Sequence, residues 1–181
     1  MVARLAEKFK NDIAPALMKR FEYSSVSAVP KLQKIVVSMG IGQAASDQAR
    51  LEACVKQLAA ITGQKPIVTL AKKAVSNFKL REGMKVGLKV TLRGQRMYEF
   101  FDRLVSLAIP RVKDFRGLNP SGFDGRGSYN MGLAEQTVFP DIDAAAVNFT
   151  QGMNIAMQTS ARTDEEAHEL LSLMGLPFRK D

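Results

Sequence analysis

The 181-residue sequence contains one cysteine, one histidine and no tryptophan. A single cysteine, Cys54, excludes an internal disulfide framework and every zinc site built from several cysteines, and we expect it in or near a core. The lone histidine, His168, provides neither a metal cluster nor a base for a serine or cysteine nucleophile, and its three glutamate neighbours predict a solvated surface position. The sequence therefore predicts no metal, no cofactor and no enzyme.

Long apolar runs are also missing. None reaches the roughly 18 residues of a membrane-spanning helix. The first residues lack the apolar core and cleavage site of a signal peptide. We therefore expect a protein of a reducing, soluble compartment, with no membrane partner.

The overall composition is that of an ordinary globular protein, with 46% hydrophobic and 24% charged residues. This length predicts one domain or a compact pair of lobes with a sizeable core. The domain prediction is a single domain over residues 1–181.

Positive charge is abundant and concentrated in the middle of the chain. The net charge is +8, and residues 65–126 alone hold fourteen basic and five acidic side chains, a net +9. Residues 127–181 carry a net −5. A polyanion partner, most often nucleic acid, is the leading physical reason for such a concentration, and a solvated basic face without a partner is the alternative.

Hydrophobic periodicity predicts alternating helices and strands. An amphipathic helix runs to about Phe21, with Pro15 either kinking it or starting a second helix. Asp47 caps a helix that closes near Gly63, and Thr163 caps the last helix. A further helix follows from about Gln95 and is stopped by Pro110. Strands are predicted over four ranges: 31–42, 67–71, 85–93 and about 153–159.

The strands favour an α+β fold. They are amphipathic and lack strict strand–helix–strand alternation, which predicts a largely antiparallel sheet with helices packed on one face. In the strand over 85–93, Lys85, Lys89, Thr91 and Arg93 point to the free face; in the strand over 31–42, Lys34 and Ser38 do so.

The stretch from Pro110 to Glu135 has neither helical nor strand periodicity, and we predict a long, ordered, functional loop there.

One motif points towards an enzyme. Residues 40–45 match the loose G-x-G-x-x-A pattern of dinucleotide-binding proteins, between a predicted strand and helix. Asp47 places a negative charge where a pyrophosphate should bind, and the next strand offers no acid for a ribose hydroxyl. A close turn explains the glycines better, and a turn after Pro140 likewise explains the carboxylates of Asp141 and Asp143.

A basic loop joins the second and third predicted strands. Five cations lie within fourteen positions: Lys72, Lys73, Lys79, Arg81 and Lys85. Phe78 lies among them, and an exposed aromatic ring there could stack on a base or ribose. The alternative is that Phe78 and Leu80 anchor the loop to the core.

Several segments together resemble one family. They are residues 29–37, 62–66, 78–83 and 89–94, the DFRGL block over 114–118 within 110–118, the FDGRG block over 123–127 and the terminal residues 177–180. In this order, over essentially the whole chain, they resemble the fifth protein of the bacterial large ribosomal subunit, the binder of 5S ribosomal RNA. The match departs from the family at Ser38, where Asn is usual, at Gly122, and over residues 143–146.

The resemblance implies a cytoplasmic protein with an α+β fold in the central protuberance of the large subunit, with no catalytic activity. The implied partners are 5S ribosomal RNA, 23S ribosomal RNA nearby, peptidyl-site tRNA, other central-protuberance proteins, and a small-subunit head protein reached through the long loop. A free regulatory RNA-binding protein and a nucleotide-dependent enzyme are the competing classes.

The site residues follow from the face pattern and the resemblance together. Carried over by position, the ribosomal-RNA candidates are Ser38, Gln64 and Thr91. The free face adds three cations to these: Lys34, Lys89 and Arg93. The implied tRNA-facing residues all belong to the basic loop: Lys72, Lys73, Asn77, Lys79 and Arg81.

Overall fold

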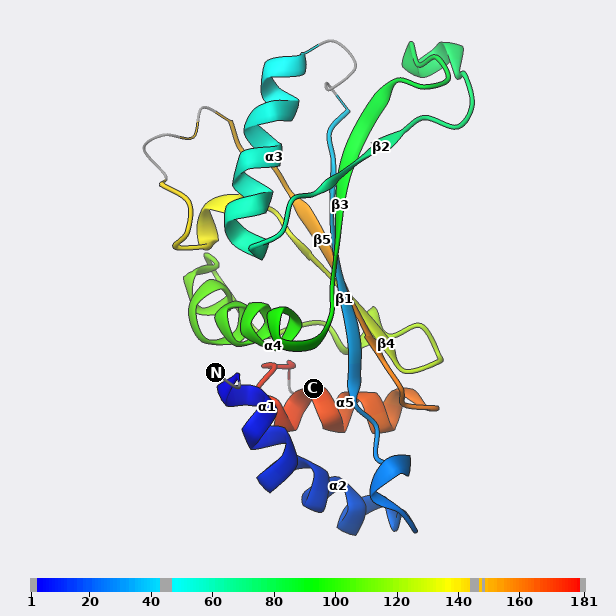
Figure 1. Ribbon diagram of the computed structural model, residues 1–181, viewed down its shortest axis with the longest axis vertical. Coiled ribbons are helices and arrows are strands. Elements are labelled where there is room, and N and C mark those ends of the chain that lie inside the picture. Colours follow the sequence, from blue (N-terminus) through cyan, green and yellow to red (C-terminus); the bar gives the residue numbers. More distant parts are fainter. Residues whose placement is uncertain (1–2, 43–46, 144–146, 148, 180–181) are drawn as a thin grey trace. The chain divides into compact units, whose positions relative to one another are not determined.

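The computed structural model of the protein describes residues 3–42, 47–143, 147 and 149–179. Its strands form one antiparallel sheet in the order β2-β3-β1-β5-β4 (Figure 1). The strands are β1 Leu32–Gly40, β2 Ile67–Leu70, β3 Lys85–Leu92, β4 Ser128–Leu133 and β5 Met153–Thr159. The α-helices are α1 Arg4–Lys8, α2 Ala14–Phe21, α3 Gln48–Thr62, α4 Gly94–Arg103 and α5 Asp164–Leu173. The predicted α+β class is confirmed, with helices packed against the sheet.

Contacts within the chain group into two compact units. The first comprises Met1–Ile35, Leu92–Met131 and Ala156–Asp181; the second comprises Val36–Thr91 and Gly132–Ile155.

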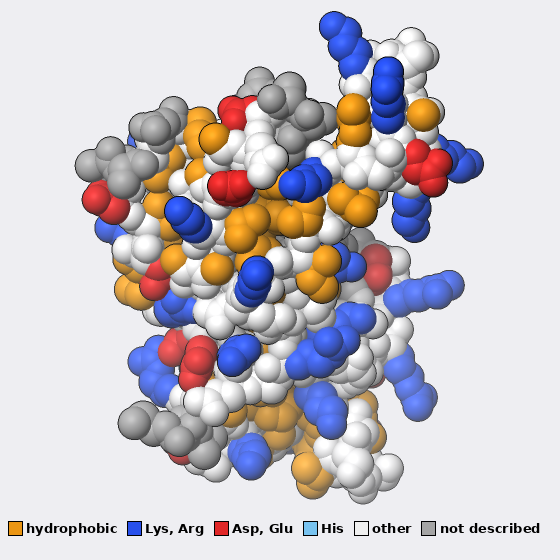
Figure 2. Space-filling model, turned by 45° about the horizontal axis from the view of Figure 1, so that its top comes forward, with side chains coloured by type: hydrophobic (Ala, Val, Ile, Leu, Met, Phe, Trp, Pro, Cys, Tyr) orange, Lys and Arg blue, Asp and Glu red, His pale blue; other side chains and the backbone are white. Residues whose placement is uncertain are grey.

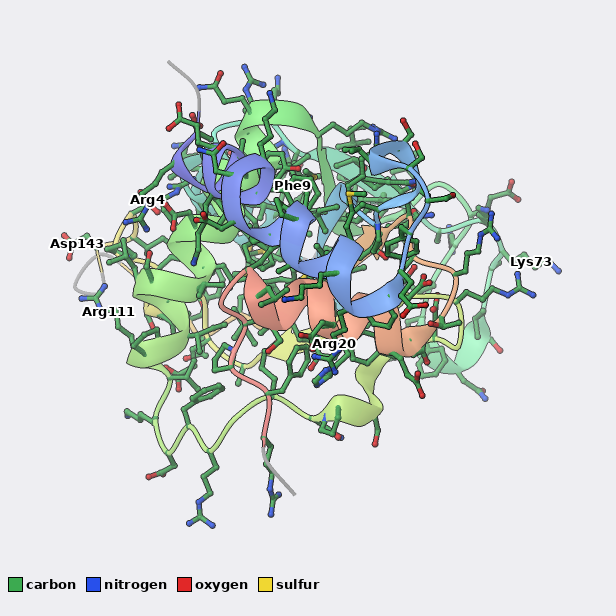
Figure 3. All side chains as sticks on the ribbon, turned by 90° about the horizontal axis from the view of Figure 1, so that it is seen from below. Arg4, Phe9, Arg20, Lys73, Arg111 and Asp143 are labelled. Carbon is green, nitrogen blue, oxygen red and sulfur yellow. The ribbon has the colours of Figure 1, made fainter. Side chains whose placement is uncertain are left out.

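In the first unit, the N-terminal and C-terminal helices pack together. Between α1 and α2 a π-helical stretch covers Phe9–Ile13, and Pro15 lies in the first turn of α2, where a missing N–H costs nothing. Arg20 of α2 forms an ion pair with Glu169 of α5 (Figure 3). The buried side chains of this unit include Leu17, Phe100 and Leu170.

The helix that was predicted to stop at Pro110 has a more complex end. α4 is followed by a π-helical stretch, Leu104–Ala108, and then by a 3-10 turn, Ile109–Arg111. Pro110 lies in the first turn of that 3-10 helix, and the helical run ends one residue later, since the backbone of Val112 is extended. The predicted end near Pro110 is therefore confirmed, and the fixed backbone angle of proline is compatible with its place in the first turn of the 3-10 helix.

In the second unit, α3 covers one face of its strands. Asp47 caps α3, since its carboxylate accepts the N–H of Arg50 at 3.0 Å, and Gly63 ends it with a left-handed backbone, φ +66°. Both boundaries are as predicted. Cys54 is fully buried on α3, and burial raises the pKa of its thiol.

The stretch from Pro110 to Glu135 was predicted to be a loop throughout, and this is wrong for its last third. β4 lies there, at the edge of the sheet. Its alternation is real, because Tyr129, Met131 and Leu133 are buried while Asn130 and Gly132 are exposed. The neighbouring glycines hide this pattern from a propensity argument, and pairing with β5 supplies the strand.

Candidate nucleic-acid interface

The strand face opposite the core carries polar side chains. In the second unit, Ser38 on β1 and Thr91 on β3 are half-buried, and Lys89 on β3 is exposed. Each alternates with buried neighbours: Val37 and Met39 on β1, Leu88, Val90 and Leu92 on β3. Because β1 and β3 are adjacent strands, these three polar side chains share one open face.

Gln64 lies in the turn between α3 and β2. It is half-buried, and its backbone carbonyl accepts the Thr62 hydroxyl at 3.1 Å. β2 pairs antiparallel with β3, with Ile67 opposite Lys89. Residues before Ile67 therefore run towards Thr91, which brings Gln64 to the Thr91 end of β3.

The other two cations predicted for this interface belong to the first unit. Lys34 on β1 is half-buried and alternates with the buried Ile35. Arg93, just after β3, is exposed.

Neutral amides extend the open face beyond the predicted residues. β5 neighbours β1, and its buried Met153 and Ile155 leave Asn154 exposed between them. A carboxamide can hydrogen-bond to ribose hydroxyls and base edges. The predicted alternation of β5 contained this signal, but no role was assigned to the outward positions.

The connection between β2 and β3 is an ordered excursion. At its base, the Ala71 N–H donates to the Met84 carbonyl at 2.8 Å. Further out, Val75 and Leu80 exchange two backbone hydrogen bonds, at 3.0 and 3.1 Å. Figure 1 shows this segment projecting beyond β2 and β3.

All five residues predicted to face tRNA are exposed on this excursion. They are Lys72, Lys73, Asn77, Lys79 and Arg81. In Figure 2 the projecting segment at upper right carries blue basic side chains around hydrophobic ones. Figure 3 shows Lys73 pointing out into solvent.

Phe78 does not anchor the loop. Its side chain is 75% exposed, whereas Leu80 is only half-exposed. The anchoring interpretation is therefore wrong for Phe78, and a largely exposed aromatic ring lies among the cations of the excursion.

The dinucleotide pattern lacks the free helix N-terminus that a bound phosphate would use. The carboxylate of Asp47 already occupies the N-terminus of α3. A side-chain carbon added at Gly40 or Gly42 would meet no described atom of the chain within 4 Å, so no packing within the described residues requires these glycines. Residues 43–45 of the pattern lie outside the described residues.

His168 is not the solvated residue that its sequence neighbours predict. Its ring is half-buried and lies 4.4 Å from that of Phe178 and 6.0 Å from that of Phe123. Asp141 and Asp143 are exposed and flank the buried Ile142.

The described ranges contain no group of three His, Cys, Asp or Glu side chains placed to hold a metal ion. Among the helices of those ranges, none has the length and apolarity to cross a bilayer.

Two family models match this chain. Residues 25–81 match the model described as ribosomal protein L5, and residues 85–178 match that of the ribosomal L5P family C-terminus.

Full-length relatives match as well. A large ribosomal subunit protein uL5 from Macrococcus caseolyticus is 58% identical over 99% of this chain and 100% of the relative. The proteins of the same name from Alkaliphilus oremlandii and Ligilactobacillus salivarius are 56% and 54% identical, again over 99% of this chain and 100% of their own length.

Proposed function

The chain belongs to the ribosomal protein L5 family, and from this we propose that it binds 5S ribosomal RNA through the open face of its sheet. Membership makes it a structural, non-enzymatic constituent of the large ribosomal subunit and hence of the cytoplasmic ribosome. The finer assignment to 5S RNA rests on the family resemblance and on the chemistry of the face.

The observation that carries the proposal is the side-chain set on adjacent strands. Thr91 and Ser38 offer hydroxyls, Gln64 offers an amide, and Lys89 adds a cation on the same open face. Hydroxyls and amides suit ribose hydroxyls and the shallow minor groove of an RNA helix, while cations suit its phosphates. Lys34 and Arg93 are proposed to add phosphate contacts.

We propose a second RNA contact for the β2–β3 excursion. Its cations are exposed at the end of a projecting, hydrogen-bonded segment, so they can reach a partner that the sheet face does not touch. Following the resemblance, that partner is the peptidyl-site tRNA.

Two further parts of the proposal rest on the resemblance. One is placement in the central protuberance, with 23S ribosomal RNA and other proteins nearby. The other is a bridge to a small-subunit head protein through the long loop; the family departure at residues 144–146 lies outside the described residues.

The chain is also proposed to act as one domain, since the boundary between its units cuts through β1, β3, β4 and β5 and not through a linker.

A paired binding and sedimentation experiment tests the 5S proposal. The purified chain should shift 5S RNA in a gel and resist competition by an unrelated structured RNA of equal length. In cell extracts it should travel with large subunits through a sucrose gradient. Equal competition by both RNAs would remove 5S recognition, and a large free pool would favour a regulatory RNA binder.

A further inference from the structure

A cavity of about 340 Å³ opens on the first unit, and no part of the proposed function uses it. It is lined by the end of α2, the first turns of α5 and the loop that leads into β4. We call it the α2–α5 cavity. Its lining combines aromatic rings with carboxylates, and this combination indicates what it can bind.

Aromatic rings form the walls of the α2–α5 cavity. Phe21, Phe123 and His168 line it, and all three are half-buried. The Phe123 ring lies 6.0 Å from that of His168 and 4.7 Å from that of the buried Tyr129. This packing fixes the wall, so a bound group meets a surface formed in advance, which lowers the ordering cost of binding.

The lining is acidic, unlike most of the chain. Three carboxylates line the cavity, those of Asp164, Glu165 and Glu169, against one arginine, Arg20. They belong to the C-terminal third of the chain, residues 127–181, whose net charge is −5. An acidic lining repels phosphates, so the backbone of RNA does not suit this cavity, whereas a cation does.

One side of the cavity already binds a guanidinium group of the chain itself. Arg20 forms an ion pair with Glu169, and its guanidinium carbon lies 5.8 Å from the centroid of the Phe21 ring. Figure 3 shows Arg20 beside α5. A carboxylate and an aromatic ring thus hold a cation here, which is the geometry of a charge-assisted cation–π site.

Glu165 provides a second carboxylate of the same kind. It lies one turn before His168 and Glu169 on the same face of α5. Asp164 is occupied by the fold, because its carboxylate accepts the N–H groups of Gly125 and Gly127 at 3.0 and 2.9 Å. Glu165, by contrast, is exposed and has no ion pair or hydrogen bond within the described part of the chain.

We propose that the α2–α5 cavity receives a lysine or arginine side chain from a basic segment of a neighbouring protein of the large subunit. The cation would pair with Glu165 and lie against the Phe123 ring, while its apolar stem packs on the aromatic wall. The proposal goes beyond RNA binding. It rests on membership of the large subunit and not on 5S recognition.

Photo-cross-linking in assembled large subunits tests this proposal. The chain carries p-benzoylphenylalanine in place of Ser121, which is exposed and adjoins the lining residue Pro120. Irradiation and mass spectrometry should identify an adduct with one neighbouring protein, in a segment that bears lysine or arginine. Glu165→Lys should lower the adduct yield at least about tenfold, because like charges then face each other. The control Glu7→Lys, at an exposed acid of the same unit, should not.

A second variant keeps the test valid if lysine in the first turn of α5 harms folding. Glu165→Gln should lower the yield about fivefold at an unchanged melting temperature, since it removes one charge-assisted contact and no internal bond. Adducts with RNA alone, no adduct with any protein, or yields undiminished in both Glu165 variants would overturn the proposal.

The free chain tests the chemistry of the cavity with defined probes. The peptide acetyl-Gly-Arg-Gly-amide should shift the NMR signals of the His168 ring, and the same peptide with neutral citrulline should not. Equal shifts would overturn cation recognition. Spermidine is the third probe: shifts by spermidine without any protein adduct in subunits would assign the cavity to a polyamine. Loss of 5S binding with intact protein adducts would refute 5S recognition and leave this inference standing.

Discussion

At the open face, substitutions of single residues can test RNA recognition and fold stability separately. In the described ranges the side chains of Gln64 and Thr91 make no hydrogen bond and are half-buried. Thr62, two residues before Gln64, is buried, and its hydroxyl donates to the Leu58 carbonyl at 2.7 Å. Thr62 is thus tied into the fold by its side chain, whereas the side chains of Gln64 and Thr91, the proposed recognition residues, are not.

Alanine at Gln64 or at Thr91 should change the free energy of unfolding by no more than about 0.5 kcal/mol, because no internal bond is lost. Affinity for 5S RNA should fall about tenfold, equivalent to one good polar contact. Thermal melts and gel shifts measure the two effects. Ser106→Ala is the control: the Ser106 hydroxyl donates to the Asp102 carbonyl away from the open face, so its loss should cost about 1 kcal/mol of stability and leave the affinity of the folded protein intact.

On the β2–β3 excursion, a substitution at Phe78 can likewise test RNA binding separately from fold stability. Because its ring is 75% exposed, Phe78→Ala should leave the melting temperature unchanged. Stacking on a base is worth about 1–3 kcal/mol, so tRNA retention by assembled ribosomes should fall at least about fivefold, and Phe78→Tyr should restore it. Val26, 68% exposed on the first unit, is the matched apolar control. Equal tRNA loss in Phe78→Ala and Val26→Ala would exclude stacking.

At the scale of elements, the sequence was enough to predict an element whose start and end signals lie within its own stretch of chain. α3 follows from its apolar spacing, the Asp47 cap and Gly63, all within one stretch of chain. The polar face follows from alternation in β1 and β3. Features that depend on distant partners were missed: β4, the packing of His168 on Phe178, and the junction of Leu118 with Phe178. No local pattern encodes contacts between such separated segments.

The β2–β3 excursion should act as a separable binding element. Replacing its four cations with glutamine should weaken tRNA retention in assembled ribosomes and leave 5S incorporation largely intact, because the sheet face is untouched. The four changes are at Lys72, Lys73, Lys79 and Arg81. Four exposed cations elsewhere form the matched control: Lys8, Lys10, Lys19 and Arg96. Loss of 5S RNA with normal tRNA retention would assign the excursion to the 5S site.

The turn that leads into β4 should make stability depend on acid pH. Asp124 accepts backbone N–H groups of Ser128 and Arg126, and these bonds hold its pKa below the ordinary 3.8. A lowered pKa contributes stability above the unfolded value, and this is lost as pH falls through the folded value.

Asp124→Ala should therefore lower the melting temperature at pH 7, and its difference from wild type should shrink progressively below about pH 3.8. Melts from pH 7 to 2.5 measure this, with the exposed Asp12→Ala as control. A difference that stayed constant to pH 2.5 would contradict the assigned hydrogen bonds.

At the scale of the whole molecule, charge should govern association with RNA. The chain carries +8 overall, with the excess in residues 65–126. Phosphate contacts release counterions, so affinity for 5S RNA should fall steeply and linearly on a double-logarithmic plot against salt. Gel shifts from 50 to 400 mM salt, roughly the range where such slopes are resolved, provide the measurement. An affinity independent of salt would contradict the electrostatic contribution.

The buried thiol of Cys54 can serve as an intrinsic probe of transient opening in the second unit. As the only sulfhydryl in the sequence, with no exposed surface and a raised pKa, it is shielded from alkylating reagents while α3 stays docked. Alkylation therefore requires a transient opening, and its rate reports how often that opening occurs. The alkylation rate of Cys54 can be compared between the free chain and the assembled ribosome. The ratio of the two rates would show how strongly assembly suppresses the transient opening of α3, and no engineered probe is needed.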